Sequence, residues 1–396
     1  MKILIAEDEA VSRKKLQRIL EKWGYEVVVT TNGAEALRAF QDDHFSLVIT
    51  DWMMPEMDGL ELVKRIRAMN LPEYVYVIML TAKSKKDDLI AGLEMGADEF
   101  VSKPFHQDEL RARVNNGLRI IRLESSLSRR NAELHEINQR MKWDLEAAAK
   151  IQASLLPAAS PNVEGITVSW RFKPCDELAG DIFNVFKLDE NEIGLYILDV
   201  SGHGVPAALL AVSVSNMMSP ILDQASLLKT YCDNAPGYQI TSPAEVLNHL
   251  NNRFPLDMEN GQYFTLLYGI LNKKTRQFRY SSAGHPGIIY QPRQQRAEIL
   301  KTPSLPVGFL ENNHYEEYTL HLEKYDRIYL YSDGIPEAES QDNKLFGQER
   351  MMQILEENRS NTLEESVNAL LTRVEEWATP SPLKDDATLL GIEITS

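Results

Sequence analysis

Residues 47–55 read LVITDWMMP, a short apolar run that ends in the acid Asp51. Such a run, bounded by polar or turn residues, is typical of a strand that is buried on both faces of a sheet. Further strands are predicted at 3–6, 27–29, 75–81 and 99–102, and stretches with helical spacing at 10–22, 34–41 and 59–69 alternate with them. This alternation predicts a parallel sheet with helices on both faces, an α/β doubly wound domain.

Acidic residues follow two of these strands. Glu7 and Asp8 end the first strand, and Asp51 ends the third. Ligands of parallel sheets bind at the carboxyl ends of the strands, so we expect these carboxylates to converge and to hold a hard divalent cation such as Mg²⁺. Thr81 and Lys103 end the fourth and fifth strands, and their hydroxyl and ammonium groups suit a phosphoryl group esterified to Asp51. A single acid at a strand end is usually a solvated loop residue, but the ordered set indicates a site.

Five short motifs carry a family resemblance over residues 1–120. They read AEDE at 6–9, TDWMMP at 50–55, MDG at 57–59, LTA at 80–82 and SKPF at 102–105. Together they resemble the receiver domain of two-component response regulators, which has a flavodoxin-like fold. The resemblance implies that Asp51 accepts a phosphoryl group and that a sensor histidine kinase is the partner that supplies it.

The same resemblance assigns roles to the residues around the phosphorylation site. It implies that Thr81 moves toward the phosphoryl group and that Phe100 occupies the aromatic switch position, with Lys103 as the third switch residue. Glu7 stands where many members of the family carry Asp, which lengthens one ligand but keeps its charge. The implied Mg²⁺ ligands are Glu7, Asp8, Asp51 and the carbonyl group of Met53.

Residues 121–156 are predicted to form a helical coiled-coil linker. Steps of three and four residues from Ile120 to Leu155 give a two-in-seven pattern that suits a coiled coil, so we expect a homodimer through this helix. Arg130 and Asp144 interrupt the pattern and either weaken self-pairing or fix its register. The alternative is a single long helix that lies on the surface of a domain. We call the apolar positions the seam: Ile120, Leu123, Leu127, Leu134, Ile137, Met141, Ala148, Ile151 and Leu155.

From residue 157 onward the pattern becomes rich in strands. Strands are predicted at 166–172, 192–200, 263–271, 279–282, 327–332 and 387–392, and helices at 205–218, 243–254 and 348–376. Strands and helices that do not alternate strictly indicate an α+β layered domain, which we place at 157–396.

Aspartates stand beside glycine or another acid at the ends of these strands. The motifs are GD at 180–181, LDVSGHG at 198–204, YSDG at 331–334 and DDAT at 385–388. Carboxylates without accompanying cysteine or paired histidine favour Mg²⁺ or Mn²⁺ over zinc. A two-metal cluster of this kind deprotonates a bridging water and stabilises in-line attack on phosphorus. A lone Asp-Gly is more often a turn, but the ordered set indicates a metal site.

Residues 150–394 resemble the PP2C-type metal-dependent serine/threonine phosphatases, in particular their bacterial SpoIIE branch. The resemblance rests on the acidic motifs above together with ELAGD at 177–181, VPAA at 205–208, AGHP at 283–286 and LPVG at 305–308. It implies an α+β layered PP2C-type phosphatase domain that binds two Mg²⁺ or Mn²⁺ ions.

The catalytic residues that this resemblance implies are Asp181, Asp199, Asp333 and Asp385. All four are implied metal ligands, with the Val200 carbonyl group and Asp386 as further ligands. We favour Asp385 over Asp386 because it aligns with the acid of the family's Asp-Asn ending, but the doublet leaves the choice open.

Three further residues near these motifs bear on the chemistry. His203 and His285 lie in Gly-His contexts, and we expect structural roles for both rather than acid catalysis. Asn184 stands where many relatives carry an acid, which argues against an additional, weaker metal site.

Composition excludes several classes of protein. The 396 residues carry a net charge of −16, and 19 basic against 33 acidic residues place −14 of it on residues 157–396. This balance argues against binding of nucleic acid or an anionic membrane, both of which require clustered positive charge. The two cysteines form no CxxC pair, and no apolar run reaches the length of a membrane span, so we expect a cytoplasmic protein.

The sequence therefore predicts a response regulator in which phosphorylation of Asp51 controls a metal-dependent phosphatase. By resemblance, the substrate is phosphoserine or phosphothreonine in an anti-sigma-factor antagonist of the STAS type, within a partner-switching pathway. The alternative is a catalytically inactive receiver–pseudophosphatase adaptor that binds a sigma factor or its regulator. Retention of the metal-binding aspartates argues against this alternative, because a scaffold has no chemical need for them.

Overall fold

The computed structural model describes residues 1–69, 71–82, 96–157, 164–234, 236–255 and 261–396. These residues form two compact units, Met1–Arg140 and Met141–Ser396. Among the helices in these ranges, none combines the length and the apolar composition that a membrane crossing requires.

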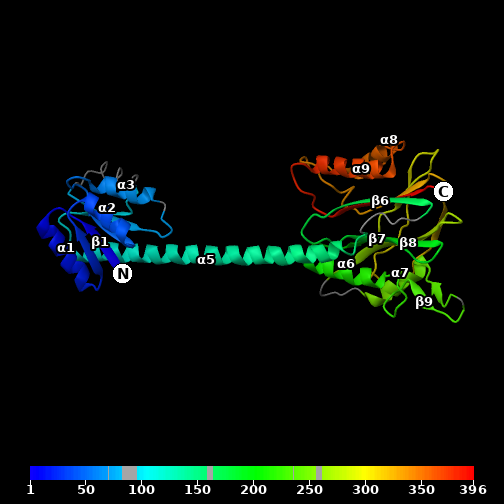
Figure 1. The fold of residues 1–396 in the computed structure, drawn as a ribbon, viewed down its shortest axis with the longest axis horizontal. Coiled ribbons are helices and arrows are strands. Elements are labelled where there is room, and N and C mark those ends of the chain that lie inside the picture. Colours follow the sequence, from blue (N-terminus) through cyan, green and yellow to red (C-terminus); the bar gives the residue numbers. More distant parts are fainter. Residues whose placement is uncertain (70, 83–95, 158–163, 235, 256–260) are drawn as a thin grey trace. The chain divides into compact units, whose positions relative to one another are not determined.

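The first unit contains a five-stranded parallel sheet in the order β2-β1-β3-β4-β5. Helices α2 and α3 cover one face of this sheet, and α1 and the first turns of α5 pack on the other face (Figure 1). The predicted doubly wound α/β architecture is therefore confirmed. Its elements are β1 Lys2–Ala6, α1 Ala10–Lys22, β2 Glu26–Thr30, α2 Gly33–Asp42, β3 Leu47–Asp51, α3 Gly59–Ala68, β4 Tyr76–Thr81 and β5 Glu99–Ser102.

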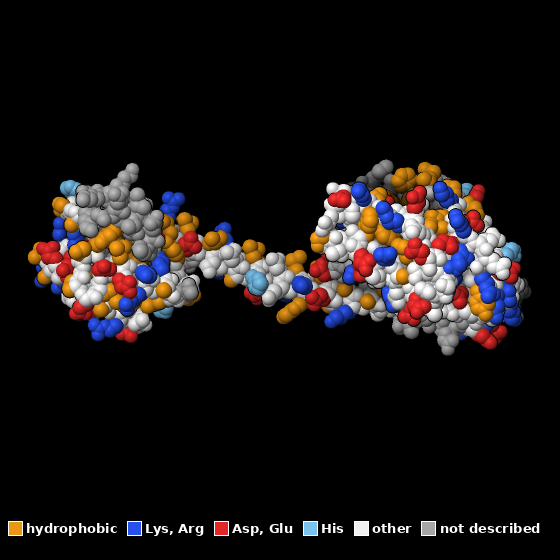
Figure 2. All heavy atoms as spheres, turned by 90° about the horizontal axis from the view of Figure 1, so that it is seen from above, with side chains coloured by type: hydrophobic (Ala, Val, Ile, Leu, Met, Phe, Trp, Pro, Cys, Tyr) orange, Lys and Arg blue, Asp and Glu red, His pale blue; other side chains and the backbone are white. Residues whose placement is uncertain are grey.

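Helix α5, Gln107–Ala153, begins earlier in the chain than the predicted linker, because its first turns cover the receiver sheet through Leu110 and Val114. The seam residues Leu127 and Leu134 are more than half exposed on this helix. Figure 2 shows hydrophobic side chains along this exposed stretch. An exposed apolar row of this kind is available for the predicted coiled-coil contact. The other seam residues that are also large and exposed are Ile120, Leu123, Ile137, Met141 and Ile151.

The second unit consists of two five-stranded sheets with helices on their outer faces. One sheet has the order β15-β12-β11-β8-β7, and the other β14-β13-β16-β17-β6. A core between the sheets joins strand residues of both, such as Leu195 and Leu390. Helices α6 and α7 cover the first sheet, and α8 and α9 cover the second (Figure 1). This arrangement confirms the predicted α+β layers.

The bounds of the strands in the second unit are as follows. They are β6 Ile166–Lys173, β7 Ile182–Lys187, β8 Glu192–Val200, β9 Lys229–Tyr231, β10 Tyr238–Ile240, β11 Phe264–Asn272, β12 Gln277–Ala283, β13 Ile288–Gln291, β14 Glu298–Leu300, β15 Tyr318–His321, β16 Arg327–Tyr331 and β17 Ala387–Ile394. The helices are α6 Val205–Met217, α7 Pro243–Arg253, α8 Gly347–Glu357 and α9 Leu363–Ala378. Strands β9 and β10 form a separate two-stranded sheet.

The single helix predicted over 348–376 is wrong, because the structure has two helices there. Helix α8 ends at Glu357, and Thr362 begins α9 with a capping box in which its hydroxyl accepts from the Glu365 amide group. The Glu365 carboxylate in turn accepts from the Thr362 amide group. Both helices still bury apolar residues against β16 and β17, which explains why the apolar pattern continues across the break.

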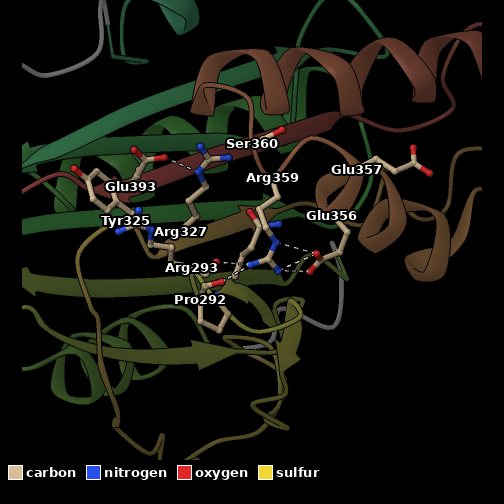
Figure 3. A pocket seen from close by; sticks show the side chains of 10 residues that line it. Pro292, Arg293, Tyr325, Arg327, Glu356, Glu357, Arg359, Ser360 and Glu393 are labelled. Atoms are coloured by element: carbon tan, nitrogen blue, oxygen red, sulfur yellow. Dashed lines mark hydrogen bonds and ion pairs between the residues drawn. The ribbon is translucent and has the colours of Figure 1, made fainter.

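A cavity of about 600 Å³ next to this break is lined by three arginines and three glutamates. Figure 3 shows that two of the guanidinium groups are held by the protein itself. Arg327 donates to Glu393 at 2.5 Å and also to Ser366 and the Asn361 carbonyl group. Arg359 pairs with Glu356. These internal partners make the cavity a structural junction between the α8–α9 loop and the second sheet.

We predict that Arg327→Ala lowers the free energy of unfolding by about 3 kcal/mol, because it leaves the Glu393 carboxylate largely buried without its partner. Urea unfolding of the full chain measures this change. Arg293→Ala is the matched control, since this exposed arginine of the same cavity stacks on Tyr325. Its loss should cost less than about 1 kcal/mol. Equal effects of the two substitutions would contradict the prediction.

Candidate functional site

The receiver acids lie at the carboxyl ends of β1 and β3. One ligand atom from each of Glu7, Asp8 and Asp51 lies within 4.8 Å of the others. A cavity of about 260 Å³ opens at this point, and Met53, Thr81 and Lys103 also line it. The structure thus brings together six of the seven receiver residues singled out in the sequence.

Lys103 bridges two of these acids. Its Nζ donates to Glu7 Oε2 at 2.6 Å and to Asp51 Oδ2 at 2.7 Å. Glu7 is fully buried, and burial raises the pKa of its carboxyl group even though Lys103 acts in the opposite direction. The ammonium group therefore offsets part of the negative charge in this pocket.

Phe100 does not line this cavity. Its ring lies 6.0 Å from that of Trp52, centroid to centroid, and the residue is half-buried beside the core under α2 and α3. Close packing also fixes the backbone at Asp51, because a Cβ atom on Gly59 would meet the Asp51 carbonyl oxygen at 2.1 Å. Only glycine fits this position, which explains its place in the MDG motif.

The phosphatase acids come from the ends of four strands in two sheets. Asp181 precedes β7, and Asp199 is the penultimate residue of β8 in the first sheet. Asp333 follows β16, and the Asp385-Asp386 pair precedes β17 in the second sheet. The acids are therefore supplied by strand ends of both sheets, and neither sheet supplies the set alone.

Asp386 acts as a backbone anchor. One of its carboxylate oxygens accepts from the amide groups of Gly180 and Asp181 at 2.7 and 3.2 Å, and the other accepts from Cys175 at 2.9 Å. Since both oxygens are engaged and the side chain is buried, this carboxylate holds the 175–181 loop in place. Asp385 is exposed, and its carboxylate accepts no hydrogen bond from the backbone of that loop. This difference favours Asp385 as the direct metal ligand of the pair.

The remaining aspartates repel one another. Burial raises the pKa of Asp199 to about 8, and the charges of Asp333 and Asp385 add to this shift. Burial, followed by the charge of Asp385, raises the pKa of Asp333 to about 6. Asp181 is buried, and its pKa is raised by burial and by Asp199, although the Thr388 hydroxyl donates to its carboxylate. After burial, the largest effects on the pKa of Asp199 come from four acids, Asp333, Asp385, Asp386 and Glu337.

Glu337 belongs to this cluster and was not among the predicted residues. Its charge raises the pKa of Asp199, Asp333 and Asp385. The residue is exposed, and its amide group donates to the Asp333 carbonyl oxygen in the turn after β16. Nothing in the sequence pattern marks it, because it follows no strand and precedes no glycine.

Two glycines allow the ends of neighbouring strands to approach closely at the site, β16 and β17 in one sheet and β7 and β8 in the other. A Cβ atom on Gly334 would meet the Asp386 carbonyl oxygen at 2.1 Å. A Cβ atom on Gly180 would lie 2.9 Å from the Val200 carbonyl oxygen, so that oxygen faces the Gly180-Asp181 backbone. Both glycines of the acidic motifs are therefore required by close contact, whatever the site binds.

The two histidines differ in their environment. His285 is buried, and its Nδ1 is 2.8 Å from the hydroxyl oxygen of Thr265, which pairs with Asp199 across β11 and β8. Burial lowers the pKa of His285 to about 3, so it is a neutral structural group, as expected. His203 is exposed and lies 3.7 Å from Asp176 at the rim of the cluster, which does not fit the structural role that we expected for it.

The donor set of this cluster fits hard divalent cations. Repulsion among half-buried carboxylates is relieved by a bound cation, and oxygen donors are the ligands of Mg²⁺ and Mn²⁺. Cys175 offers a sulfur atom within 4.8 Å of the Asp385 and Asp386 oxygens. Burial and the neighbouring acids raise the pKa of its thiol to about 12, which disfavours the thiolate that a softer metal would need.

Comparison with protein-family models gives two matches. Residues 189–395, just over half of the chain, match the model of Stage II sporulation protein E (SpoIIE). The chain belongs to the SpoIIE family. Residues 3–115 match the response regulator receiver domain. The protein is thus a receiver domain joined to a SpoIIE-family domain, which is a PP2C-type metal-dependent serine/threonine protein phosphatase domain.

Similar proteins support both halves. The phosphoserine phosphatase RsbU of Bacillus subtilis is 29% identical over 261 residues, which cover 65% of this chain and 72% of that protein. The probable transcriptional regulator ycf27 of Pyropia yezoensis is 45% identical over 118 residues, or 30% of this chain and 47% of its own length. Thus the chain spans about half of this receiver relative. The solved SiaA-PP2C domain of Pseudomonas aeruginosa shares the fold, with a TM-score of 0.53 at 20% identity, and covers 65% of this chain and 98% of that domain.

We predict that Asp199→Asn stabilises the protein in EDTA at pH 8 by about 2 kcal/mol, because it removes a carboxylate that burial and neighbouring acids destabilise. The same substitution should abolish the increase in melting temperature that Mn²⁺ gives the wild type. Thermal unfolding with and without Mn²⁺ measures both effects. Asp189→Asn is the control, since this acid of the β7–β8 turn caps the backbone of Asn191 and Glu192 and lies outside the cluster. A lower stability of Asp199→Asn in EDTA would contradict the prediction.

Proposed function

We propose that this protein is a response regulator whose phosphorylation at Asp51 controls the removal of phosphate from phosphoserine or phosphothreonine in a protein. The observation that carries the proposal is the convergence of Asp181, Asp199, Asp333 and Asp385 between two sheets, with raised pKa values caused by burial and mutual repulsion. A phosphate group is repelled by such a cluster unless cations are bound there, so the site requires metal to bind its substrate.

In the phosphatase site we propose Asp181, Asp199, Asp333 and Asp385 as ligands of two Mg²⁺ or Mn²⁺ ions, assisted by the Val200 carbonyl group. Bound divalent cations supply Lewis acidity for the activation of water and offset the charge of the phosphate. The protein's own contribution is to hold the four carboxylates in place. Thr388 donates to Asp181, and Asp386 fixes the backbone of the 175–181 loop.

In the receiver we propose Asp51 as the phosphoryl acceptor, with Mg²⁺ held by Glu7, Asp8, Asp51 and the Met53 carbonyl group. Lys103 already contacts an Asp51 oxygen, so it is placed to neutralise the added phosphoryl charge. The proposed switch consists of Thr81, Phe100 and Lys103. A sensor histidine kinase is the proposed phosphoryl donor.

We further propose that the substrate is a phosphorylated anti-sigma-factor antagonist of the STAS type. Similarity to the phosphoserine phosphatase RsbU supports a phosphoserine substrate. We propose domain limits of 1–120, 121–156 and 157–396, a cytoplasmic location, and no role for nucleic acid or membrane, in accord with the acidic composition.

We predict that Mn²⁺-dependent hydrolysis of p-nitrophenyl phosphate by the full chain falls more than about 100-fold in Asp199→Ala, because a metal ligand is lost. Asp189→Ala, the same change at an acid outside the cluster, should keep the activity. No hydrolysis by folded wild type that binds Mn²⁺ would overturn the enzyme proposal and favour the adaptor.

Phosphorylation of the receiver should change this activity, in one direction or the other. Turnover is measured before and after treatment with acetyl phosphate and Mg²⁺, and the ratio should differ from one in the wild type. Asp51→Ala should give a ratio of one, because it removes the acceptor carboxylate. Asp43→Ala, which changes an exposed acid of the same domain, should retain the wild-type ratio. The same ratio in wild type and Asp51→Ala would contradict receiver control.

We propose that the exposed seam of α5 pairs with the seam of a second copy. A row of large apolar side chains at heptad spacing, each more than a third exposed, has the pattern of a coiled-coil interface. We predict that Leu134→Glu converts a dimer into a monomer in sedimentation velocity experiments, because it places a charge in the seam of both helices. Asn138→Glu adds the same charge beside the seam and should leave the dimer intact. A monomeric wild type in both phosphorylation states would contradict the proposal.

A further inference from the structure

The last turn of helix α5 holds a buried polar side chain next to the phosphatase acids. Gln152 is 8% exposed, although its neighbour Ile151 in the seam is 67% exposed. Its Nε2 donates to the Ala179 carbonyl oxygen at 2.7 Å, and its Oε1 accepts from the Ala179 amide group at 3.1 Å. The side-chain amide therefore satisfies both backbone groups of one residue, as a neighbouring strand would.

Ala179 lies two residues before Asp181. On one side of this short segment, the Gln152 amide holds Ala179. On the other side, the Asp386 carboxylate accepts from the amide groups of Gly180 and Asp181. The backbone that carries the Asp181 carboxylate is thus fixed between the end of α5 and the start of β17. Loss of either partner leaves buried backbone groups without hydrogen bonds, and the segment then moves to regain them.

Further contacts join the end of α5 to the same sheet. Leu155 and Leu156 pack against the buried cores, and the Asn184 side chain donates to the Leu155 carbonyl oxygen at 3.3 Å. Asn184 lies in β7, which begins directly after Asp181. The end of the linker helix and the residues after it are therefore hydrogen-bonded to the Ala179 backbone before this acid and to the Asn184 side chain after it.

From these contacts we infer that Gln152 is a positioning residue that couples helix α5 to the metal site by holding the 179–181 backbone. The inference rests on the proposed function and names the route of its regulation. Rotation or translation of the end of α5 moves the Gln152 amide, which moves Ala179 and with it the Asp181 carboxylate. Ile151 belongs to the exposed seam, and its neighbour Gln152 contacts the backbone beside Asp181. Two adjacent residues of one helical turn therefore face the proposed dimer contact and the phosphatase site, respectively.

The test measures Mn²⁺ binding to the full chain by electron paramagnetic resonance of the free ion, together with turnover of p-nitrophenyl phosphate. In Gln152→Ala we expect the Mn²⁺ concentration for half-saturation to rise about tenfold. This value is the lower end of the loss of metal affinity that follows when a group that orients a metal ligand is removed. Turnover at saturating Mn²⁺ should remain within about twofold of the wild type, since no ligand is removed. Gln139→Ala, at an exposed glutamine of the same helix, should change neither quantity.

A second variant separates positioning from packing. Gln152→Met has a similar volume but no polar atoms, so it keeps the packing and should still show the weaker Mn²⁺ binding. In both variants, treatment with acetyl phosphate should no longer change the half-saturation concentration. Wild-type Mn²⁺ affinity in either folded variant would overturn the inference, and so would the failure of both to fold.

The two proposals fail in different ways. A wild type that binds Mn²⁺ but hydrolyses no phosphoester contradicts the proposed function, while Mn²⁺ binding by the Gln152 variants still decides the inference. An active wild type whose Gln152 variants bind Mn²⁺ normally and still respond to acetyl phosphate leaves the proposed function intact and removes Gln152 from its regulation.

Discussion

Repulsion among converging carboxylates is the constraint on which this structure depends. In the phosphatase unit, acids from four strand ends in two sheets must lie together, so the backbone beneath them has to be held by other groups. Asp386 accepts hydrogen bonds from three backbone amide groups, and Gly334 allows the chain after β16 to come into contact with the Asp386 backbone. Close packing and buried hydrogen bonds thus stabilise an arrangement that electrostatics alone would drive apart.

The two acidic pockets of the chain meet this constraint differently. In the receiver, Lys103 lies within hydrogen-bonding distance of both Glu7 and Asp51 and supplies an internal counter-charge. In the phosphatase cluster, burial and then the charges of neighbouring acids raise the pKa of Asp199. The receiver pocket therefore contains its own ammonium counter-charge, whereas the phosphatase cluster would depend mainly on the proposed cations.

Sequence patterns predicted the long, regular elements well and the local ones less well. Strand β8 has the predicted bounds of 192–200, because nine residues of nearly continuous apolar character leave little ambiguity. The break between α8 and α9 was missed, since the apolar pattern continues across it and the capping box at Thr362 is a local signal. The acidic motifs located the site, but neither Glu337 nor Gln152 was identified, because their roles arise from contacts with residues distant in the sequence. For the same reason, the sequence did not show that Asp386 holds the 175–181 backbone, an observation that supports the preference for Asp385 as the proposed ligand.

The uncompensated cluster also affects the lifetime of the protein. A cation that binds only the folded chain raises the free energy of unfolding in proportion to the logarithm of its concentration. Proteases degrade chains that open transiently, and the population of open chains grows as that free energy falls. With cations bound as proposed above, the resistance of the protein to proteolysis would therefore depend on the supply of divalent metal, so metal scarcity would lower the amount of protein as well as its activity.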